Sequence, residues 1–533
     1  MVNLFCCYRP KKKNPIPKLV DRSLPDPILE LVFSQLDDSG SKGLYSCLTV
    51  NSKWNLKARQ ILWKRPFTSK PLSQENSIKL IRTLLLCLDT TTKQMLRALL
   101  KDGRPITNII PNESPLFNYA SLMNELDYKE FEISIQSYLL NFMSNLSIEH
   151  IHLIAKSLFI LIMRTGSTFR SLIIDKFSED YANLPITEIQ LQRKSNYLSR
   201  ITKLNLNYYE SSDIFDFLRL LPTICNDLLE FTVTICDFEN EALVNRSVAD
   251  VISSQRALKK FSMDGARNGG NTILIALGGS QSKTLTSAKF RLMNFKSAGM
   301  RSLAKCSQLK ELLFENCQGL TIEITKILYN AKLKNLKNLI IWNYHKVPTV
   351  TSLLIKSTMN SELKELTLDI MIIGTVNTIL EHCPNITTLK IFDYQPKHNI
   401  QMFRLLKGLP NLERLTIYRE TKVELGVINF SGNYLPNNLK YLRLECGISS
   451  DQLDNLLKGL RDRSKLKILI IDYFKTERSH LKVIVEWVKR SRTLKFLGIG
   501  GKSIFSKGEL TELNILQKEY GVSIIPSHKF DYY

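Results

Sequence analysis

The sequence predicts an α/β fold in which strand–helix repeats stack into a solenoid, preceded by a smaller all-helical module. Three features predict this architecture. A short apolar phrase recurs along the C-terminal two-thirds of the 533-residue chain. The segments between these phrases carry apolar residues at helical spacing, and the N-terminal region follows a separate helical pattern.

The repeated phrase has apolar residues at its first, fourth and sixth positions, as in Leu309, Leu312 and Phe314. Successive copies begin 23 to 30 residues apart. They start at Ile201, Leu228, Leu258, Leu285, Leu309, Leu336, Leu363, Ile386, Leu412, Leu439, Leu466 and Leu494. This period is typical of leucine-rich repeats, whose units bury their apolar faces by stacking on one another.

Residues 166–533 are therefore expected to form a leucine-rich-repeat solenoid, a horseshoe with one strand and one helix per repeat. A weaker copy at Phe169, Leu172 and Ile174 is expected to open the array, and Val522 to Ile525 to form its last strand. Terminal repeats commonly depart from the consensus. The alternative interpretation is an ordinary parallel sheet whose regularity arises by chance.

Composition indicates a folded protein with an excess of positive charge. Lys and Arg number 73 against 50 Asp and Glu, a net charge of +23. Such a charge would suit an acidic partner, but the basic residues are scattered, which favours a solvated surface over a phosphate-binding module. The ten cysteines show no zinc spacing and follow no secretory leader, so we expect reduced thiols in a cytoplasmic or nuclear protein.

The first helical module spans residues 19–67. It begins with Leu24-Pro25-Asp26-Pro27, and prolines are tolerated in a first helical turn. Apolar residues then recur at helical spacing in three segments. These are Ile28, Leu29, Val32, Phe33 and Leu36; Leu44, Cys47, Leu48 and Val50; and Trp54, Ala58, Leu62 and Trp63. So small a unit cannot cover all its apolar side chains, which predicts a partner.

These residues resemble an F-box, the three-helix module by which substrate receptors join Skp-cullin-F-box ubiquitin ligases. Leu44 to Trp54 has the form Leu-x-x-Cys-Leu-x-Val-Asn-x-x-Trp, which is similar to the fungal F-box proteins with leucine-rich repeats. One departure is Pro27, at a place where the F-box usually carries an acidic residue. The resemblance implies a receptor whose F-box binds a Skp-type adaptor and, through it, cullin and RING subunits.

The resemblance also implies roles for individual residues. Leu48, Trp54 and Trp63 are expected to pack the module itself. The residues expected to contact the adaptor are Leu24, Pro25, Ile28, Leu29, Val32, Phe33 and Val50.

The flanking segments have less specific patterns. Residues 68–165 show helical spacing and little Gly, Ser or Pro, which predicts a packed helical spacer. Residues 1–18 are expected to be a disordered basic tail. Within this tail, Cys6 and Cys7 precede Lys11 to Lys13, so acylation combined with charge is an alternative route to a membrane.

No catalytic residue, metal site or cofactor is predicted. Gly498 to Ser503 is similar to a phosphate-binding loop but has Phe496 where the first glycine is required. His382-Cys383 has no second pair of ligands nearby in sequence. The chain is therefore expected to be a non-catalytic subunit.

The third, fifth and seventh positions of each phrase are expected to face the concave side of the solenoid. Between Asn338 and Arg443 these positions combine aromatic and cationic residues, which are common at protein interfaces. The residues expected to contact a protein client are Asn338, Trp342, Lys390, Phe392, Arg414, Tyr418, Tyr441 and Arg443. The alternative function is a non-ligase scaffold that binds nucleic acid or anionic lipid.

Overall fold

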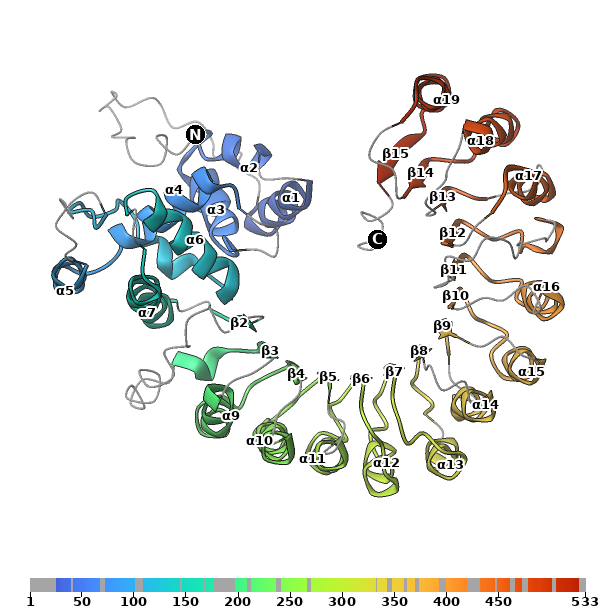
Figure 1. Ribbon diagram of the computed structural model, residues 1–533, viewed down its shortest axis with the longest axis horizontal. Helices are drawn as coiled ribbons and strands as arrows, with labels where there is room; N and C mark the ends of the chain where they lie inside the picture. Colours follow the sequence, from blue (N-terminus) through green and yellow to red (C-terminus); the bar gives the residue numbers. More distant parts are fainter. Residues whose placement is uncertain are drawn as a thin grey trace. The chain divides into compact units, whose positions relative to one another are not determined.

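The computed structural model describes two compact units, residues 1–258 (unit 1) and 259–533 (unit 2). The described residues are 25–39, 42–67, 72–100, 109–143, 146–166, 169–176, 197–208, 212–235, 241–265, 270–331, 333–342, 348–358, 362–369, 373–392, 399–418, 432–445, 448–460, 465–471, 478–500 and 505–526. Each unit is built from parallel strands joined by helices, as the sequence predicts (Figure 1).

Unit 1 begins with helices and continues into the first repeats. Its helices are α1 (Asp26–Ser39), α2 (Lys42–Cys47), α3 (Ser52–Leu62), α4 (Gln74–Leu86), α5 (Thr90–Leu99), η3 (Tyr119–Leu122), α6 (Tyr128–Leu140), α7 (Ile148–Thr165), η4 (Tyr197–Arg200), α9 (Ser212–Ile224) and α10 (Glu241–Ser254). Its strands are β1 (Glu125–Asp127), β2 (Ser171–Lys176), β3 (Lys203–Tyr208) and β4 (Glu230–Ile235).

Unit 2 consists of repeats throughout. Its strands are β5 (Lys260–Asp264), β6 (Ser287–Arg291), β7 (Glu311–Glu315), β8 (Asn338–Trp342), β9 (Glu365–Leu368), β10 (Thr388–Ile391), β11 (Arg414–Tyr418), β12 (Tyr441–Glu445), β13 (Ile468–Ile471), β14 (Phe496–Ile499) and β15 (Ser523–Pro526). Its helices are α11 (Gly270–Ser280), α12 (Ser297–Leu303), α13 (Ile322–Ala331), α14 (Pro348–Ser357), α15 (Ile373–His382), α16 (Asn399–Gly408), η6 (Gly432–Tyr434), α17 (Ser450–Gly459), α18 (Arg478–Ser491) and α19 (Lys507–Lys518).

Within unit 2 the strands pair in chain order and in parallel, and they line the inner side of an arc with the helices outside (Figure 1). The first, fourth and sixth residues of the phrase form the core between these layers; Leu336, Leu339 and Ile341 are all buried. The residue before each strand from β5 to β13 accepts two backbone hydrogen bonds from the next repeat. Lys337, for example, accepts from the amides of Lys364 at 2.8 Å and Glu365 at 2.9 Å.

The two outermost copies of the phrase both form strands, but only the last of them is terminal. The copy containing Leu172 and Ile174 forms β2, and the last strand is β15, paired with β14. The predicted helical spacer differs in one respect, because it contains β1, which pairs in parallel with β2. The sheet of unit 1 therefore starts some forty residues earlier in the chain than the apolar phrases indicate.

The first helical module is joined to this sheet by backbone hydrogen bonds. The carbonyl of Lys64 accepts from the amides of Asn124 at 2.8 Å and Glu125 at 3.1 Å, the same pattern that links successive repeats. Aromatic contacts support the junction, because Trp63 packs on Tyr119 with ring centroids 4.6 Å apart. The helices α1–α3 and strand β1 are thus parts of one packed structure within unit 1.

Two neighbouring glycines of α11 provide a test of how closely α11 and α12 pack. A Cβ atom on Gly278 would lie 2.0 Å from the carbonyl oxygen of Ser302, whereas one on Gly279 would meet nothing within 4 Å. We expect Gly278→Ala to destabilise unit 2 by about 1–3 kcal/mol through overpacking. Gly279→Ala should be neutral or stabilise it by up to about 1 kcal/mol, because Ala favours the helix. Thermal unfolding of the two variants measures the difference; equal stabilities would contradict the close packing.

Candidate adaptor-binding surface and client face

Helix α1 presents three distinct faces, which follow from its sequence at helical spacing. One face, with Leu29 and Phe33, is apolar and buried. A second, with Asp26 and Glu30, is acidic. The third, with Ile28 and Val32, is apolar and exposed. A helix with two apolar faces fits a module that packs its own core on one side and binds a partner on the other.

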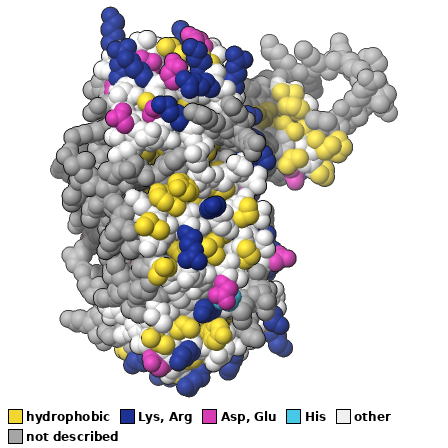
Figure 2. Space-filling view, turned by 90° about the vertical axis from the view of Figure 1, so that its right-hand side faces the viewer, with side chains coloured by type: hydrophobic (Ala, Val, Ile, Leu, Met, Phe, Trp, Pro, Cys, Tyr) yellow, Lys and Arg dark blue, Asp and Glu magenta, His cyan; other side chains and the backbone are white. Residues whose placement is uncertain are grey.

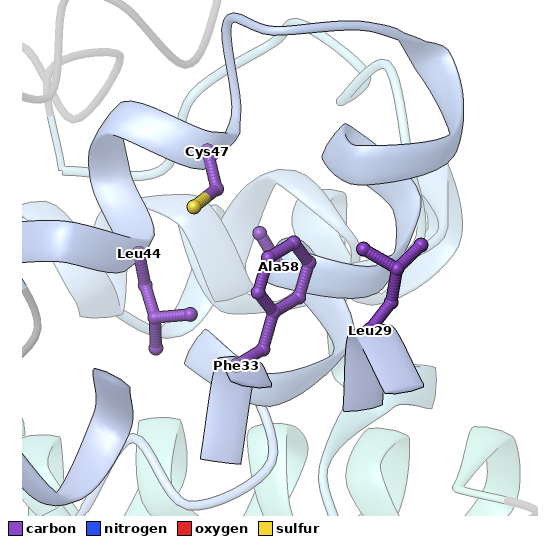
Figure 3. Close-up of a cluster of buried hydrophobic side chains, with 5 residues drawn as sticks. All are labelled: Leu29, Phe33, Leu44, Cys47 and Ala58. Carbon is purple, nitrogen blue, oxygen red and sulfur yellow. The ribbon is translucent and has the colours of Figure 1, made fainter. Parts of the chain in front are cut away.

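The buried face forms the core of the module. Leu29, Phe33, Leu44, Cys47 and Ala58 converge from α1, α2 and α3 (Figure 3). The ring of Phe33 meets Trp54 edge to face, with centroids 5.2 Å apart. Leu48 and Trp54 pack against this cluster, as predicted.

This packing corrects the expectation for Leu29 and Phe33. Both side chains have 0% exposure, so in this structure they offer no surface to an adaptor. The physical reason is the docking of α2 and α3 on that side of α1, which encloses both side chains. Their role here is to hold the three helices together.

The acidic face of α1 is paired with α3. Lys57 lies 2.6 Å from Glu30 and 3.3 Å from Asp26, and Lys53 lies 3.0 Å from Asp26. Hydrogen bonds from Lys53 and, to a smaller extent, from Lys57 hold the pKa of the Asp26 carboxyl below its ordinary value. These exposed ion pairs add to the contact between α1 and α3, whose core is formed by the buried apolar face.

The exposed face of α1 carries Ile28 (46% exposed), Leu31 (65%) and Val32 (40%). These residues are three and four positions apart, which places them side by side on one helix face. Pro25 and Val50 are also exposed, so four of the seven predicted contact residues are accessible. Leu24 lies outside the described residues. Leu31 was not among the residues predicted from the sequence, although its spacing from Ile28 places it on the same helix face.

Further exposed apolar side chains of the module are Tyr45 on α2 and Leu56 on α3, which the sequence analysis also missed. The turn before α3 is fixed by Asn51, whose side chain accepts a hydrogen bond from the amide of Trp54 at 2.8 Å. This cap gives Asn51 of the motif a structural explanation.

The concave face of unit 2 carries a stack of aromatic side chains. Trp342 at the end of β8 lies parallel to Phe392, which follows β10, with ring centroids 4.7 Å apart and planes at 15°. Phe392 also contacts Tyr418 at the end of β11, with centroids 5.3 Å apart. Burial alternates along β8 and β11. The buried residues are Leu339, Ile341, Leu415 and Ile417, and Trp342 and Tyr418 lie on the concave side. The three rings are half-buried.

Cationic residues lie beside this stack. The guanidinium of Arg414 lies 4.4 Å from the ring centre of Tyr441. Lys390, Thr416 and Arg443 occupy one row across β10, β11 and β12. Asn338 is half-buried at the start of β8. Tyr441 corrects the expectation, because it is only 6% exposed and packs with Ile470, so it supports Arg414 rather than offering a surface of its own.

Nearer the start of unit 2, the concave face is occupied by ion pairs. Arg291 bridges Asp264 at 3.4 Å and Glu315 at 3.1 Å, and Lys289 lies 3.0 Å from Glu311. Burial raises the pKa values of the Asp264 and Glu315 carboxyls, and Arg291 opposes that shift. These carboxylates neutralise the neighbouring cations. Beside the aromatic stack, Arg443 is likewise paired with Glu445.

The other motifs set aside on sequence grounds gain no support. Gly498 lies within β14, and Lys502 and Ser503 are outside the described residues. Among the described side chains, no group of three or more His, Cys, Asp or Glu residues could hold a metal ion. In the described part of the chain, no helix has both the length and the apolar character needed to cross a bilayer. Cys6 and Cys7 also lie outside the described residues.

Comparisons with known proteins support the resemblance drawn for the first module. A family model described as F-box-like matches residues 21–69. A comparison with curated proteins gives no match. Among solved structures, the chain is similar to one in the crystal structure of the Rad7 and Elc1 complex in yeast. That likeness has 12% sequence identity and a TM-score of 0.30, and covers 76% of this chain and 94% of that one.

Proposed function

We propose that this chain, in which an F-box-like domain precedes a solenoid of leucine-rich-repeat type, is the substrate-recognition subunit of a Skp-cullin-F-box E3 ubiquitin ligase. The observation that carries the proposal is the F-box-like match at residues 21–69, on a module whose first helix exposes Ile28, Leu31 and Val32. An apolar helix face of this kind is what an adaptor can cover. Burying each such side chain contributes at most about 1.5–3 kcal/mol.

The chain would act by positioning rather than by chemistry. Its F-box would bind a Skp-type adaptor and, through it, the cullin and RING subunits, while the concave face holds a protein client. Tethering raises the effective concentration of the client's lysines near the transfer machinery. Within unit 1, the bonds from Lys64 to β1 favour this function, because a rigid junction between module and first repeats preserves geometry.

Co-expression with a Skp-type adaptor tests the proposal. The wild-type chain should elute with the adaptor as one complex in size-exclusion chromatography, and addition of cullin and RING subunits should give a larger complex. A folded chain that elutes separately from the adaptor would overturn the proposal.

The aromatic stack should be required for client capture. We expect Trp342→Ala combined with Phe392→Ala to lower client enrichment about thirtyfold, because central aromatic anchors contribute about 2 kcal/mol or more to binding. The measurement is proximity labelling, by which clients are identified as proteins enriched with the wild-type chain.

A matched control is available on the outer side of unit 2. Phe403 of α16 and Tyr434 of η6 form another parallel stacked pair, with centroids 4.5 Å apart. Phe403→Ala with Tyr434→Ala likewise removes a stacked aromatic pair and should leave client enrichment unchanged. Equal losses in the two double variants would place client binding elsewhere.

A further inference from the structure

One edge of unit 2, where its strands begin, carries a row of lysines. The residue immediately before the strand is Lys at seven of the ten phrases from Leu258 to Leu494. These residues, named here the basic edge, are Lys259, Lys310, Lys337, Lys364, Lys440, Lys467 and Lys495. All are exposed except Lys440, which is half-buried. Among the described residues, Lys440 is the one member with a recorded ion pair, to Glu413 at 2.6 Å.

The fold does not require lysine at this position. Its backbone carbonyl accepts two hydrogen bonds from the next repeat, and the side chain takes no part. Thr387 makes the same bonds, accepting from the amides of Glu413 at 2.8 Å and Arg414 at 2.9 Å. Thr286 does so as well, accepting from Lys310 and Glu311. The repeated choice of lysine therefore calls for an explanation outside the stability of the repeat.

The register of the sheet makes the basic edge planar. Asn338 pairs directly with Glu311 on one side and with Glu365 on the other. The later strands, up to the one that begins at Phe496, also pair first residue to first residue. Because the first residues of neighbouring strands are aligned, the residues that precede the strands are aligned as well. The lysines thus form a curved row in one plane, with neighbouring members about 5 Å apart where strands adjoin.

A polar hollow of about 280 Å³ interrupts the row at β10 and β11. Lys364, Lys440 and Lys465 line it together with Asn385 and Asn411. Glu413 also lines it, with its carboxylate held by Lys440. Lys465 donates to Asn438 at 2.9 Å, so of these three lysines Lys364 contributes most directly to the positive charge of the hollow.

Unit 2 as a whole also carries a net positive charge. Unit 2 contains 42 Lys and Arg against 23 Asp and Glu. In the view of Figure 2, Lys and Arg side chains recur from top to bottom and acidic ones are fewer.

We propose that the basic edge binds the surface of an anionic lipid bilayer. A flat surface can meet all the coplanar lysines at once, whereas a duplex, being a cylinder, meets a curved row only in part. The edge also offers few stacking platforms for single-stranded nucleic acid. At the second and third positions of the ten phrases, the aromatic residues are Tyr441, which is buried, and Phe496, which is 36% exposed. Lysines near an anionic membrane each add to the attraction.

The test is binding of the full chain to vesicles of phosphatidylcholine alone or mixed with phosphatidylserine. Wild type should sediment with the mixed vesicles only, and less so as salt is raised. The edge variant replaces Lys337, Lys364, Lys467 and Lys495 by Gln. It should bind the mixed vesicles at least tenfold more weakly, because each lysine near such a surface changes the partition about fivefold.

The control variant replaces four other exposed lysines of unit 2 by Gln, all at or near the opposite edge, where helices begin. These are Lys296, Lys326, Lys482 and Lys507. Both variants lose the same charge and should unfold at the temperature of wild type. The control should retain vesicle binding.

Three results would overturn the proposal. The first is that wild type binds the vesicles equally with and without phosphatidylserine. The second is that the edge and control variants weaken equally, which would mean that net charge alone is responsible. The third is that the edge variant keeps its vesicle binding but loses affinity for a DNA duplex in fluorescence anisotropy, which would assign the edge to nucleic acid. Each result is independent of adaptor binding and hence of the proposed ligase function.

Discussion

Replacing Ile28 and Val32 together by Asp is expected to abolish binding of a Skp-type adaptor without unfolding the chain. Both side chains are exposed, at 46% and 40%, so the free protein accommodates the carboxylates in water. In a complex the same carboxylates would be buried against an apolar partner surface. Burying an unpaired charge costs several kcal/mol, so we expect affinity to fall by more than about a hundredfold.

The measurement is titration calorimetry with purified adaptor, accompanied by circular dichroism to show that the variant is folded. Ile373 and Ile400 supply a matched control, because both are exposed isoleucines at helix starts in unit 2, at 59% and 76%. Ile373→Asp with Ile400→Asp should bind the adaptor like wild type. Unchanged affinity of the Ile28 and Val32 variant would place the adaptor on another surface.

The repeats could be predicted from sequence because their physics is local and periodic. A buried apolar residue at the first, fourth and sixth positions is needed in every unit, so a chance match would not recur over twelve copies. Strand β1 escaped prediction because it has three residues and a single fully apolar one, Leu126. Its place in the sheet comes instead from the carbonyl of Lys64, some sixty residues earlier, a bond that no local pattern encodes.

The adaptor face could be predicted only in part for a different reason. The sequence shows two apolar faces on α1 but does not say which one α3 covers. That choice follows from how α2 and α3 pack around Leu29 and Phe33, which is a set of contacts between helices. Consequently Ile28 and Val32 remain candidates for the adaptor surface, whereas Leu29 and Phe33 belong to the core.

The concave face shows the same limit. The position of a residue in the phrase correctly predicts that Trp342 and Tyr418 lie on the concave side. It does not predict how deeply a side chain is buried. Tyr441 is buried because its neighbour strand β13 is apolar at every position, so Ile468 and Ile470 pack against its ring. The uninterrupted apolar sequence of β13 was the signal from which the burial of Tyr441 could have been predicted.

Phe33→Ala is expected to destabilise the helices α1–α3 by about 3–5 kcal/mol, the usual cost of removing a buried ring. Phe33 has 0% exposure and contacts Trp54 edge to face, so its loss leaves a cavity at the centre of the cluster in Figure 3. A module of three short helices has little other core to compensate. Hydrogen exchange measured by mass spectrometry should show lost protection across residues 26–39.

The same experiment reports whether the module and the sheet of unit 1 unfold together. Because the Lys64 carbonyl binds the amides of Asn124 and Glu125, unfolding of α3 should also expose β1 to exchange, while β5–β15 keep their protection. Val32→Ala, one residue away on the exposed face, should change stability by no more than about 0.5 kcal/mol. Protection in Phe33→Ala equal to that of wild type would show that the cluster does not hold the module together.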